Sequence, residues 1–148
     1  EHKISSHAML SGMRLMGIDF GTKKVGLALS DPNGTMAFPH SVIPNDSSLL
    51  AAIVSLIEAE SVVGVVIGHS LDKEGKENAV HENVKEFITD LTLQNPVPVH
   101  LEPEQYSKQQ ALHIQGRNDK TDAAAAAIIL ESYLNKQKNT NIFDELND

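Results

Sequence analysis

The sequence predicts a single α/β domain in which a mixed β-sheet carries helices on both faces. Three short apolar segments with turns between them open the chain, which is typical of an antiparallel meander. The hydrophobic period then changes, and helical and strand-like segments alternate, which is typical of β-α units. A length of 148 residues fits one domain of this kind with a core of its own.

Five segments have the composition of β-strands. The first two are apolar runs that flank a turn at Gly21, and a strong turn signal at residues 31–34 ends the second. The third alternates apolar and polar residues and contains Pro39, which favours an edge strand because proline has no backbone N–H to donate. The fourth is apolar throughout, as expected for a strand buried on both faces of a parallel pair. In chain order the segments cover residues 13–19, 25–30, 35–43, 62–67 and 97–101.

Four segments have helical patterns. Polar residues that can cap a helix precede the first, and its apolar residues recur at the spacing of one helix face. These residues are Leu49, Ile53, Leu56 and Ile57. The last helix follows Thr121, a capping residue, and its alanine run lets the helix backbone approach the sheet closely. In chain order the predicted helices cover residues 49–60, 78–93, 106–114 and 122–134.

This order of elements predicts a five-stranded sheet with strand order 3-2-1-4-5, in which the first strand is central. The first, fourth and fifth strands then run parallel, so their C-terminal ends meet at one edge. We expect the domain to cover residues 13–137. Residues 1–12 are expected to be a disordered leader or cloning remnant, with Met13 as a natural start, and residues 138–148 a loose, polar and acidic tail.

The composition narrows the classes of site and partner. The chain has no cysteine, which excludes disulfides and thiolate metal sites, so any metal must be held by Asp, Glu, His or carbonyl oxygens. The net charge of −8 argues against nonspecific binding to nucleic acid, but the carboxylates of a metal site add to that charge until ions bind. No apolar run approaches the roughly 20 residues that span a membrane, and no signal peptide pattern is present. We therefore expect a cytoplasmic protein without a membrane partner.

Three acids stand at special positions of the predicted sheet. Asp19 ends the first strand, Glu104 follows the fifth, and Asp122 lies in the first turn of the last helix. Carboxylates at one sheet edge can converge on two Mg²⁺ or Mn²⁺ ions about 3.5–4 Å apart, which clamp the attacking and leaving oxygens of a phosphodiester. Glu102 is a rival to Glu104, although Pro103 between them favours Glu104 because proline suggests that the strand has ended. The plainer interpretations are a turn residue for Asp19, a surface residue for Glu104 and a helix-dipole partner for Asp122.

Polar and basic side chains near the same edge could contact a nucleic-acid backbone. The loop after the fourth strand, residues 68–75, contains glycines that allow tight turns, and its His69 and Ser70 could contact a phosphate or position water. Four basic residues could form a rim around the acids, namely Lys23, Lys24, Arg117 and Lys120. The plainer interpretations are an ordinary surface loop and solvated charges.

Residues 17–28, which read Gly-Ile-Asp-Phe-Gly-Thr-Lys-Lys-Val-Gly-Leu-Ala and are followed by Ser-Asp, closely resemble the opening motif of the YqgF/RuvX family. Residues 65–75 resemble the glycine-containing loop of that family, and residues 122–134 resemble its closing helix. The resemblance extends over about residues 13–134. The family consists of RNase H-like proteins that are named as candidate Holliday junction resolvases and as nucleases that mature pre-16S rRNA.

The resemblance implies a role for each acid. Asp19 matches the first catalytic, metal-binding acid of the family, Asp122 matches the last, and Glu104 matches the glutamate of the middle motif. The chain departs from that middle motif at two positions, since Pro103 stands in place of an acid and Gln105 in place of an arginine. An arginine there would contact phosphate, so its absence weakens the expected grip on a substrate.

By this resemblance the chain is expected to be an RNase H-like nuclease that uses Mg²⁺ or Mn²⁺ to hydrolyse phosphodiesters of an rRNA precursor or of branched DNA. A resolvase would act as a homodimer, because a junction has two strands to cut. One alternative is a catalytically weakened binding module of the same fold, which the altered middle motif and the acidic charge favour. Another is a fragment of a sugar kinase or actin-like ATPase, which shares the Asp-x-Gly-Thr hairpin but needs two lobes around its nucleotide.

Overall fold

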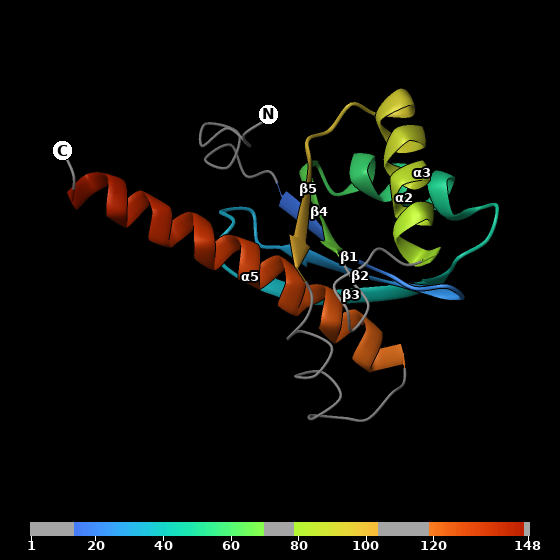
Figure 1. Cartoon of the computed structure of the whole chain (residues 1–148), viewed down its shortest axis with the longest axis horizontal. Helices are drawn as coiled ribbons and strands as arrows, with labels where there is room; N and C mark the ends of the chain where they lie inside the picture. Colours follow the sequence, from blue (N-terminus) through green and yellow to red (C-terminus); the bar gives the residue numbers. More distant parts are fainter. Residues whose placement is uncertain (1–13, 70–78, 104–118, 147–148) are drawn as a thin grey trace.

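The computed structural model of the chain describes residues 14–69, 79–103 and 119–146. It contains a five-stranded mixed sheet with helices on both faces (Figure 1). The elements in chain order are β1 (Arg14–Phe20), β2 (Lys24–Ser30), β3 (Ala37–Pro44), α2 (Leu49–Ala59), β4 (Val62–His69), α3 (Ala79–Gln94), β5 (Val99–Pro103) and α5 (Asp119–Leu146). The predicted leader at residues 1–12 and the predicted helix at residues 106–114 lie outside the described residues.

The strand order is β3-β2-β1-β4-β5, as the sequence predicts. The hairpin β1–β2 and the next pair β2–β3 are antiparallel, whereas β4 pairs in parallel with β1 and β5 in parallel with β4. The C-terminal ends of β1, β4 and β5 therefore meet at one edge of the sheet. At this edge, Ile18 of β1 pairs with Ile67 of β4, and Gly68 of β4 pairs with Glu102 of β5.

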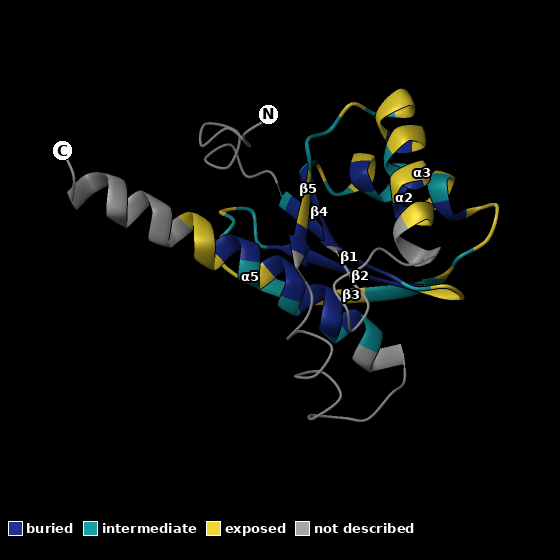
Figure 2. Ribbon diagram, viewed as in Figure 1, coloured by how far each residue is buried: buried dark blue, intermediate teal, exposed yellow. Residues whose placement is uncertain are grey.

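Strand alternation divides the core into two layers, one on each side of the sheet. On one side α2 and α3 cover Met16, Ile18 and Phe20 of β1 together with the matching residues of β2 and β4. On the other side α5 covers the opposite face, where Leu15 packs with residues of the alanine-rich first half of that helix. Figure 2 shows the buried residues of α5 in a row along the sheet. The covering of both faces explains why β1 and β4 are apolar at almost every position.

The helix α5 is longer at both ends than the sequence indicates. It begins at Asp119, so Thr121 lies inside the helix and the prediction of a cap at Thr121 was wrong. It continues to Leu146, so the prediction of a loose tail after residue 137 was also wrong for most of that segment, and α5 extends past the sheet (Figure 1). The physical reason is that residues 119–146 contain no glycine or proline, and Lys, Gln, Glu and Leu favour helix even where the hydrophobic pattern is weak.

The strand β3 lies at one edge of the sheet, as predicted from its proline. Its pairing with β2 shifts register between Leu27 and Ala28, and Pro39 lies next to that shift. A bulge and a proline both interrupt the row of backbone groups that an edge strand would otherwise offer to another chain. None of the helices in the described parts of the chain has the length and apolar character to cross a membrane.

A buried hydroxyl joins the first two strands. Oγ of Ser30 accepts a hydrogen bond from the backbone N–H of Leu15 at 2.9 Å and donates one to the carbonyl of Asp31 at 2.8 Å. Ser30 is 2% exposed, so water does not reach this N–H group easily. The hydroxyl satisfies a backbone donor beside the register shift at Arg14 and Leu15.

Replacing Ser30 with alanine should lower the free energy of unfolding by about 1–3 kcal/mol, because the buried N–H of Leu15 loses its acceptor. Urea denaturation followed by circular dichroism measures this change. The matched control is Ser55→Ala on the exposed side of α2, which should change stability by no more than about 0.5 kcal/mol. Equal stability of the two variants would contradict the assigned role of the hydroxyl.

Candidate functional site

Asp19 lies at the C-terminal end of β1 with its side chain on the α5 side of the sheet. The alternation of β1 requires this placement, because Met16, Ile18 and Phe20 face α2 and α3 while Leu15 faces α5. Asp19 is 6% exposed, which is unusual for a carboxylate in an otherwise apolar strand. Its Oδ1 is buried and accepts no hydrogen bond within the described residues, although Asp19 takes part in a further interaction.

A glycine brings the first turn of α5 beside Asp19. Gly26 of β2 is the direct cross-strand partner of Asp19. A Cβ atom built on Gly26 would lie 2.1 Å from the backbone carbonyl oxygen of Asp122. The absence of a side chain at Gly26 therefore lets the backbone of Asp122 rest on the strand, next to the position of Asp19. The structure brings these two predicted site residues together, and Asp122 is half-buried there.

The same close approach continues along α5. A Cβ atom on Gly17 would lie 2.6 Å from the carbonyl oxygen of Ala126 and 2.8 Å from Cβ of Leu130. The alanines of this helix supply the matching surface, since Ala123, Ala125, Ala126 and Ala127 are buried. Small residues on both sides allow a short distance between helix and sheet, which fixes how far Asp122 stands from the strand ends.

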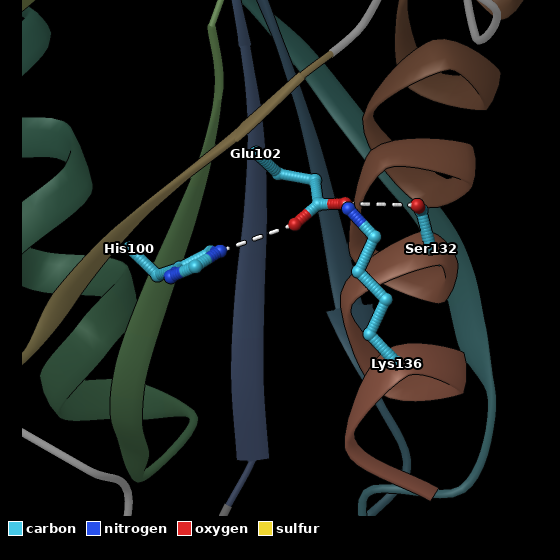
Figure 3. Close-up of polar contacts among 4 residues, drawn as sticks. All are labelled: His100, Glu102, Ser132 and Lys136. Carbon is cyan, nitrogen blue, oxygen red and sulfur yellow. Dashed lines mark hydrogen bonds and ion pairs between the residues drawn. The ribbon is translucent and has the colours of Figure 1, made fainter. Parts of the chain in front are cut away.

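Glu102, the rival for the middle acid, is also on the α5 side of the sheet, and it is 1% exposed. Its Oε1 lies 3.1 Å from Nε2 of His100, and its Oε2 lies 2.6 Å from Nζ of Lys136 (Figure 3). Oε2 also accepts a hydrogen bond of 2.9 Å from the hydroxyl of Ser132. Both oxygens of this carboxylate are therefore occupied by protein groups.

The surroundings of Glu102 favour its charged form. Burial alone raises the pKa of Glu102, but the hydrogen bonds from Lys136, Ser132 and His100, together with the positive charge of Lys136, outweigh it and hold the pKa below its ordinary value. The pKa of the neighbouring Tyr133 hydroxyl is shifted upward instead. Burial of the hydroxyl is the larger cause, and the negative charge of Glu102 is the smaller one. Sequence reasoning missed Ser132 and Lys136 as partners, although their spacing of four residues places them on one face of a helix.

The hairpin between β1 and β2 holds two of the predicted basic residues. Lys23 and Lys24 are both exposed, at the edge where Asp19 ends its strand. Asn45, which the sequence did not single out, fixes this hairpin. Its side-chain amide donates to the carbonyl of Gly21 at 2.7 Å, and its backbone N–H donates to the carbonyl of Lys23 at 2.9 Å. The backbone of the hairpin is therefore held while its lysine side chains face solvent.

The other predicted site residues are placed only in part. Residues Glu104, Gln105, Ser70 and Arg117 lie outside the described residues. His69 ends β4 and Lys120 lies in the first turn of α5, but neither side chain is described. Both backbone positions belong to elements that reach the edge of the sheet where Asp19 lies.

Two of the predicted acids suit a hard divalent cation. Mg²⁺ and Mn²⁺ prefer carboxylate oxygens and keep several ligands from water or substrate phosphate, so two protein carboxylates are an adequate start for such a site. The described residues contain no group of three or more Asp, Glu or His side chains close enough to hold a metal. Asp19 and Asp122 therefore fit part of a divalent metal site, and Glu102 does not add to it because its oxygens are taken.

Comparisons with known proteins show the family of the chain. The family model of RuvX, described as Holliday junction resolvase, matches residues 13–136. A protein of Maridesulfovibrio salexigens named "Putative pre-16S rRNA nuclease" is 35% identical over 132 residues, which cover 82% of this chain and 98% of that protein. A protein of Oleidesulfovibrio alaskensis with the same name is 35% identical over 133 residues, which cover 83% of this chain and 92% of that protein.

Solved structures confirm the predicted fold. RuvC of Thermus thermophilus in complex with a Holliday junction substrate superposes with a TM-score of 0.59 at 15% identity, covering 86% of this chain and 97% of that chain. The fowlpox virus resolvase in complex with Holliday junction DNA superposes with a TM-score of 0.56 at 12% identity, covering 84% and 99%. At these identities the likeness concerns the RNase H-like fold.

Proposed function

The chain belongs to the RuvX family and is a nuclease, and from this premise we propose that it hydrolyses phosphodiesters of structured nucleic acid with divalent metal ions held by Asp19, Asp122 and Glu104. The observation that carries the proposal is the packing at Gly26. This glycine is the cross-strand partner of the buried Asp19 and lies under the backbone of Asp122, so two carboxylates come from two elements to one sheet edge.

The state of Glu102 supports Glu104 as the middle acid. Glu102 is bound to Lys136, Ser132 and His100, so a metal could use its oxygens only by displacing these partners from a buried carboxylate. Glu104 follows β5 directly in sequence and matches the family motif. We therefore assign Glu104 as the third ligand and Glu102 as a structural neighbour.

The residues of the site divide the work of hydrolysis. Bound Mg²⁺ or Mn²⁺ supplies a water of lowered pKa and positive charge beside the phosphate. Asp19 holds its ligand position rigidly, because it belongs to the central strand and is buried. Asp122 is held by the contact of its own backbone with β2. Burial of Asp19 keeps bulk water from competing for the carboxylate, which strengthens its attraction for a cation.

An rRNA precursor is the substrate we favour. The two relatives described above, each 35% identical to this chain, carry a name that refers to pre-16S rRNA. Lys23 and Lys24 are exposed beside the acids, and with His69, Ser70, Arg117 and Lys120 they would contact the backbone of the nucleic acid. A local basic rim of this kind is compatible with a net charge of −8, since phosphate contacts act over short distances at physiological salt.

A four-way DNA junction is the second candidate, because the family description names a Holliday junction resolvase. Cutting both strands of a junction would call for a homodimer. The altered middle motif, with Pro103 and Gln105, keeps a third alternative open: a binding module whose cleavage is weak. These three candidate functions give different results in a single cleavage assay.

The test is a cleavage assay on a labelled 16S rRNA precursor and on a four-way junction, each with Mn²⁺, with Mg²⁺ and with chelator. The proposal predicts metal-dependent cleavage of the precursor and much weaker cleavage of the junction. Preferred cleavage of the junction would replace the substrate assignment by the second candidate. Tight binding of either nucleic acid without any cleavage would favour the binding module and contradict the assigned mechanism.

The Lys23→Gln variant should bind RNA more weakly, and by the same factor for every RNA sequence. The reason is that it loses a contact to phosphate and no contact to a base. The slope of log affinity against log salt should fall by about 1 in magnitude. Filter binding of a radiolabelled precursor at several salt concentrations measures this slope. The control is Lys85→Gln, an exposed lysine of α3 on the opposite side of the sheet from Asp19. An unchanged slope for Lys23→Gln would remove Lys23 from the proposed interface.

A further inference from the structure

A polar cluster around one buried carboxylate joins β5 to α5. We call it the Glu102 cluster, and its members are His100, Glu102, Ser132 and Lys136 (Figure 3). Two members are on the strand and two on the helix, 30 or more positions apart in the sequence. Beside it, the rings of His100 and Tyr133 lie with centroids 4.7 Å apart at 51°. The strand and helix are thus connected by directional bonds in addition to apolar contact.

The cluster is costly to form unless it is complete. A buried carboxylate that lacks its partners is strongly unfavourable, so Glu102 requires both the ammonium of Lys136 and the hydroxyl of Ser132. The ion pair of Glu102 with Lys136 contributes little to net stability, because the Lys136 side chain is 60% exposed and water screens the attraction. Its main effect is on specificity, since the bonds form in only one relative placement of strand and helix.

The rest of the interface defines the placement of α5 less sharply. In the first half of α5, alanines of the helix lie against two glycines of the sheet. These small residues allow a short distance between helix and sheet. Large buried side chains of α5, such as Ile129, Leu130 and Leu134, pack on the same face, and together these apolar contacts set the distance between helix and sheet. Such contacts are not directional, so they select one axial and rotational placement less strictly than hydrogen bonds do. The bonds of Ser132 and Lys136 to Glu102 restrict both the sliding and the rotation of α5. Because Asp122 lies in the first turn of the same helix, its position is restricted as well.

We propose that Glu102 is a positioning residue, which sets the axial and rotational placement of α5 on the sheet and thereby the position of Asp122 relative to Asp19. The inference rests on the proposed function of those two acids, although the placement of the helix itself does not. It predicts that breaking the cluster shifts or broadens the position of α5 while the sheet stays folded.

The placement of α5 can be measured without any reference to cleavage. The chain has no cysteine, so a pair of introduced cysteines takes spin labels at two sites only. Suitable exposed positions are Ser55 on α2 and Glu131 on α5, on opposite sides of the sheet. Electron–electron double resonance should give one narrow distance in the otherwise wild-type protein. Lys136→Met should broaden or shift that distance, and Lys136→Arg, which keeps a charged donor, should restore most of it.

The consequence for the site is measured with Mn²⁺ affinity and steady-state kinetics. Lys136→Met should lower kcat by about 10- to 100-fold with a smaller change in KM, because a displacement near 1 Å costs that much in a metal-assisted reaction. The matched control is Val84→Ala, a buried residue of α3 on the other side of the sheet, which loses stability without touching α5. Below its unfolding transition this control should keep both its kcat and its Mn²⁺ affinity.

The outcomes separate the inference from the proposed function. An unchanged label distance in Lys136→Met overturns the inference, whatever the activity of the protein. A changed distance together with kcat and Mn²⁺ affinity equal to those of Val84→Ala also overturns it, because α5 would then move without affecting Asp122. Absence of Mn²⁺ binding and of cleavage in the wild-type protein would instead contradict the proposed function, while the label distances would still report on the placement of α5.

Discussion

An Asp19→Asn variant should lose cleavage of the rRNA precursor by on the order of 10³-fold or more, because the amide cannot replace a carboxylate as the central metal ligand. Asp19 is held rigidly, since it lies on the central strand and is 6% exposed. Initial rates at saturating Mn²⁺ and substrate measure the loss. Cleavage that persists at wild-type rates would remove Asp19 from the mechanism.

The Asp19→Asn variant should also differ from the wild type in how its thermal stability responds to metal. Asparagine and aspartate have nearly the same size and shape, so the variant should keep its fold and unfold cooperatively without metal. With Mn²⁺ at 100 times its Kd, the wild type should gain about 2.7 kcal/mol, and the variant should gain much less. Thermal unfolding with and without Mn²⁺ therefore tests the metal site separately from the chemistry.

Asp31→Asn is the matched control for Asp19→Asn. Asp31 is also an acid at the end of a strand, but it follows β2 and so lies at the opposite end of the sheet. Its Oδ1 accepts hydrogen bonds from the backbone N–H groups of Thr35 and Met36 at 2.7 and 2.9 Å, which an amide oxygen can also accept. Asp31→Asn should keep its activity and its response to Mn²⁺. A loss equal to that of Asp19→Asn would mean that the effect of Asp19 is not specific to the site.

The sequence was sufficient to predict the sheet and the places of Asp19 and Asp122 in it. Apolar runs of strand length, one proline and the turn signals predict the five strands because each cue is local in the sequence. The succession of a three-stranded meander and two β-α units then predicts the order 3-2-1-4-5. The positions of Asp19 and Asp122 follow from the same local cues, since one ends a strand and the other opens an alanine-rich helix. Their approach depends on Gly26, which the sequence shows only as a small residue in an apolar strand.

Other features depend on contacts between distant residues and could not be read in this way. The partners of Glu102 lie on a helix 30 or more residues later, and nothing in the local pattern of β5 indicates them. Pro103 favoured Glu104 over Glu102 on the expectation that it ends the strand, but this ground was wrong, since β5 continues to Pro103. The bonds of Glu102 are the structural reason to prefer Glu104. The far end of α5 was mistaken for a tail because its hydrophobic pattern fades after Leu134, while its helix propensity does not.

We expect Gly26→Ala to disturb the site more than a methyl group added at any other position of the sheet. The added Cβ would lie 2.1 Å from the carbonyl oxygen of Asp122 and 2.6 Å from its carbonyl carbon, so backbone must move. Overpacking of this kind costs about 1–3 kcal/mol of stability. The first turn of α5 has to lift from β2, which carries Asp122 away from Asp19, so kcat should fall by about 10²-fold. Urea denaturation and initial rates, measured well below the unfolding transition, give the two effects.

Gly17→Ala separates displacement of the site from general damage. Its Cβ would meet the same helix at 2.6 Å from the carbonyl oxygen of Ala126, one turn further along, so the loss of stability should be similar. Lifting α5 at Ala126 displaces Asp122 less than lifting it at Asp122 itself. Gly26→Ala should therefore lose more of its kcat and Mn²⁺ affinity than Gly17→Ala at equal cost in stability. Equal losses would show that the metal site depends on the overall stability of the domain, and that the contact of Asp122 with Gly26 has no role of its own.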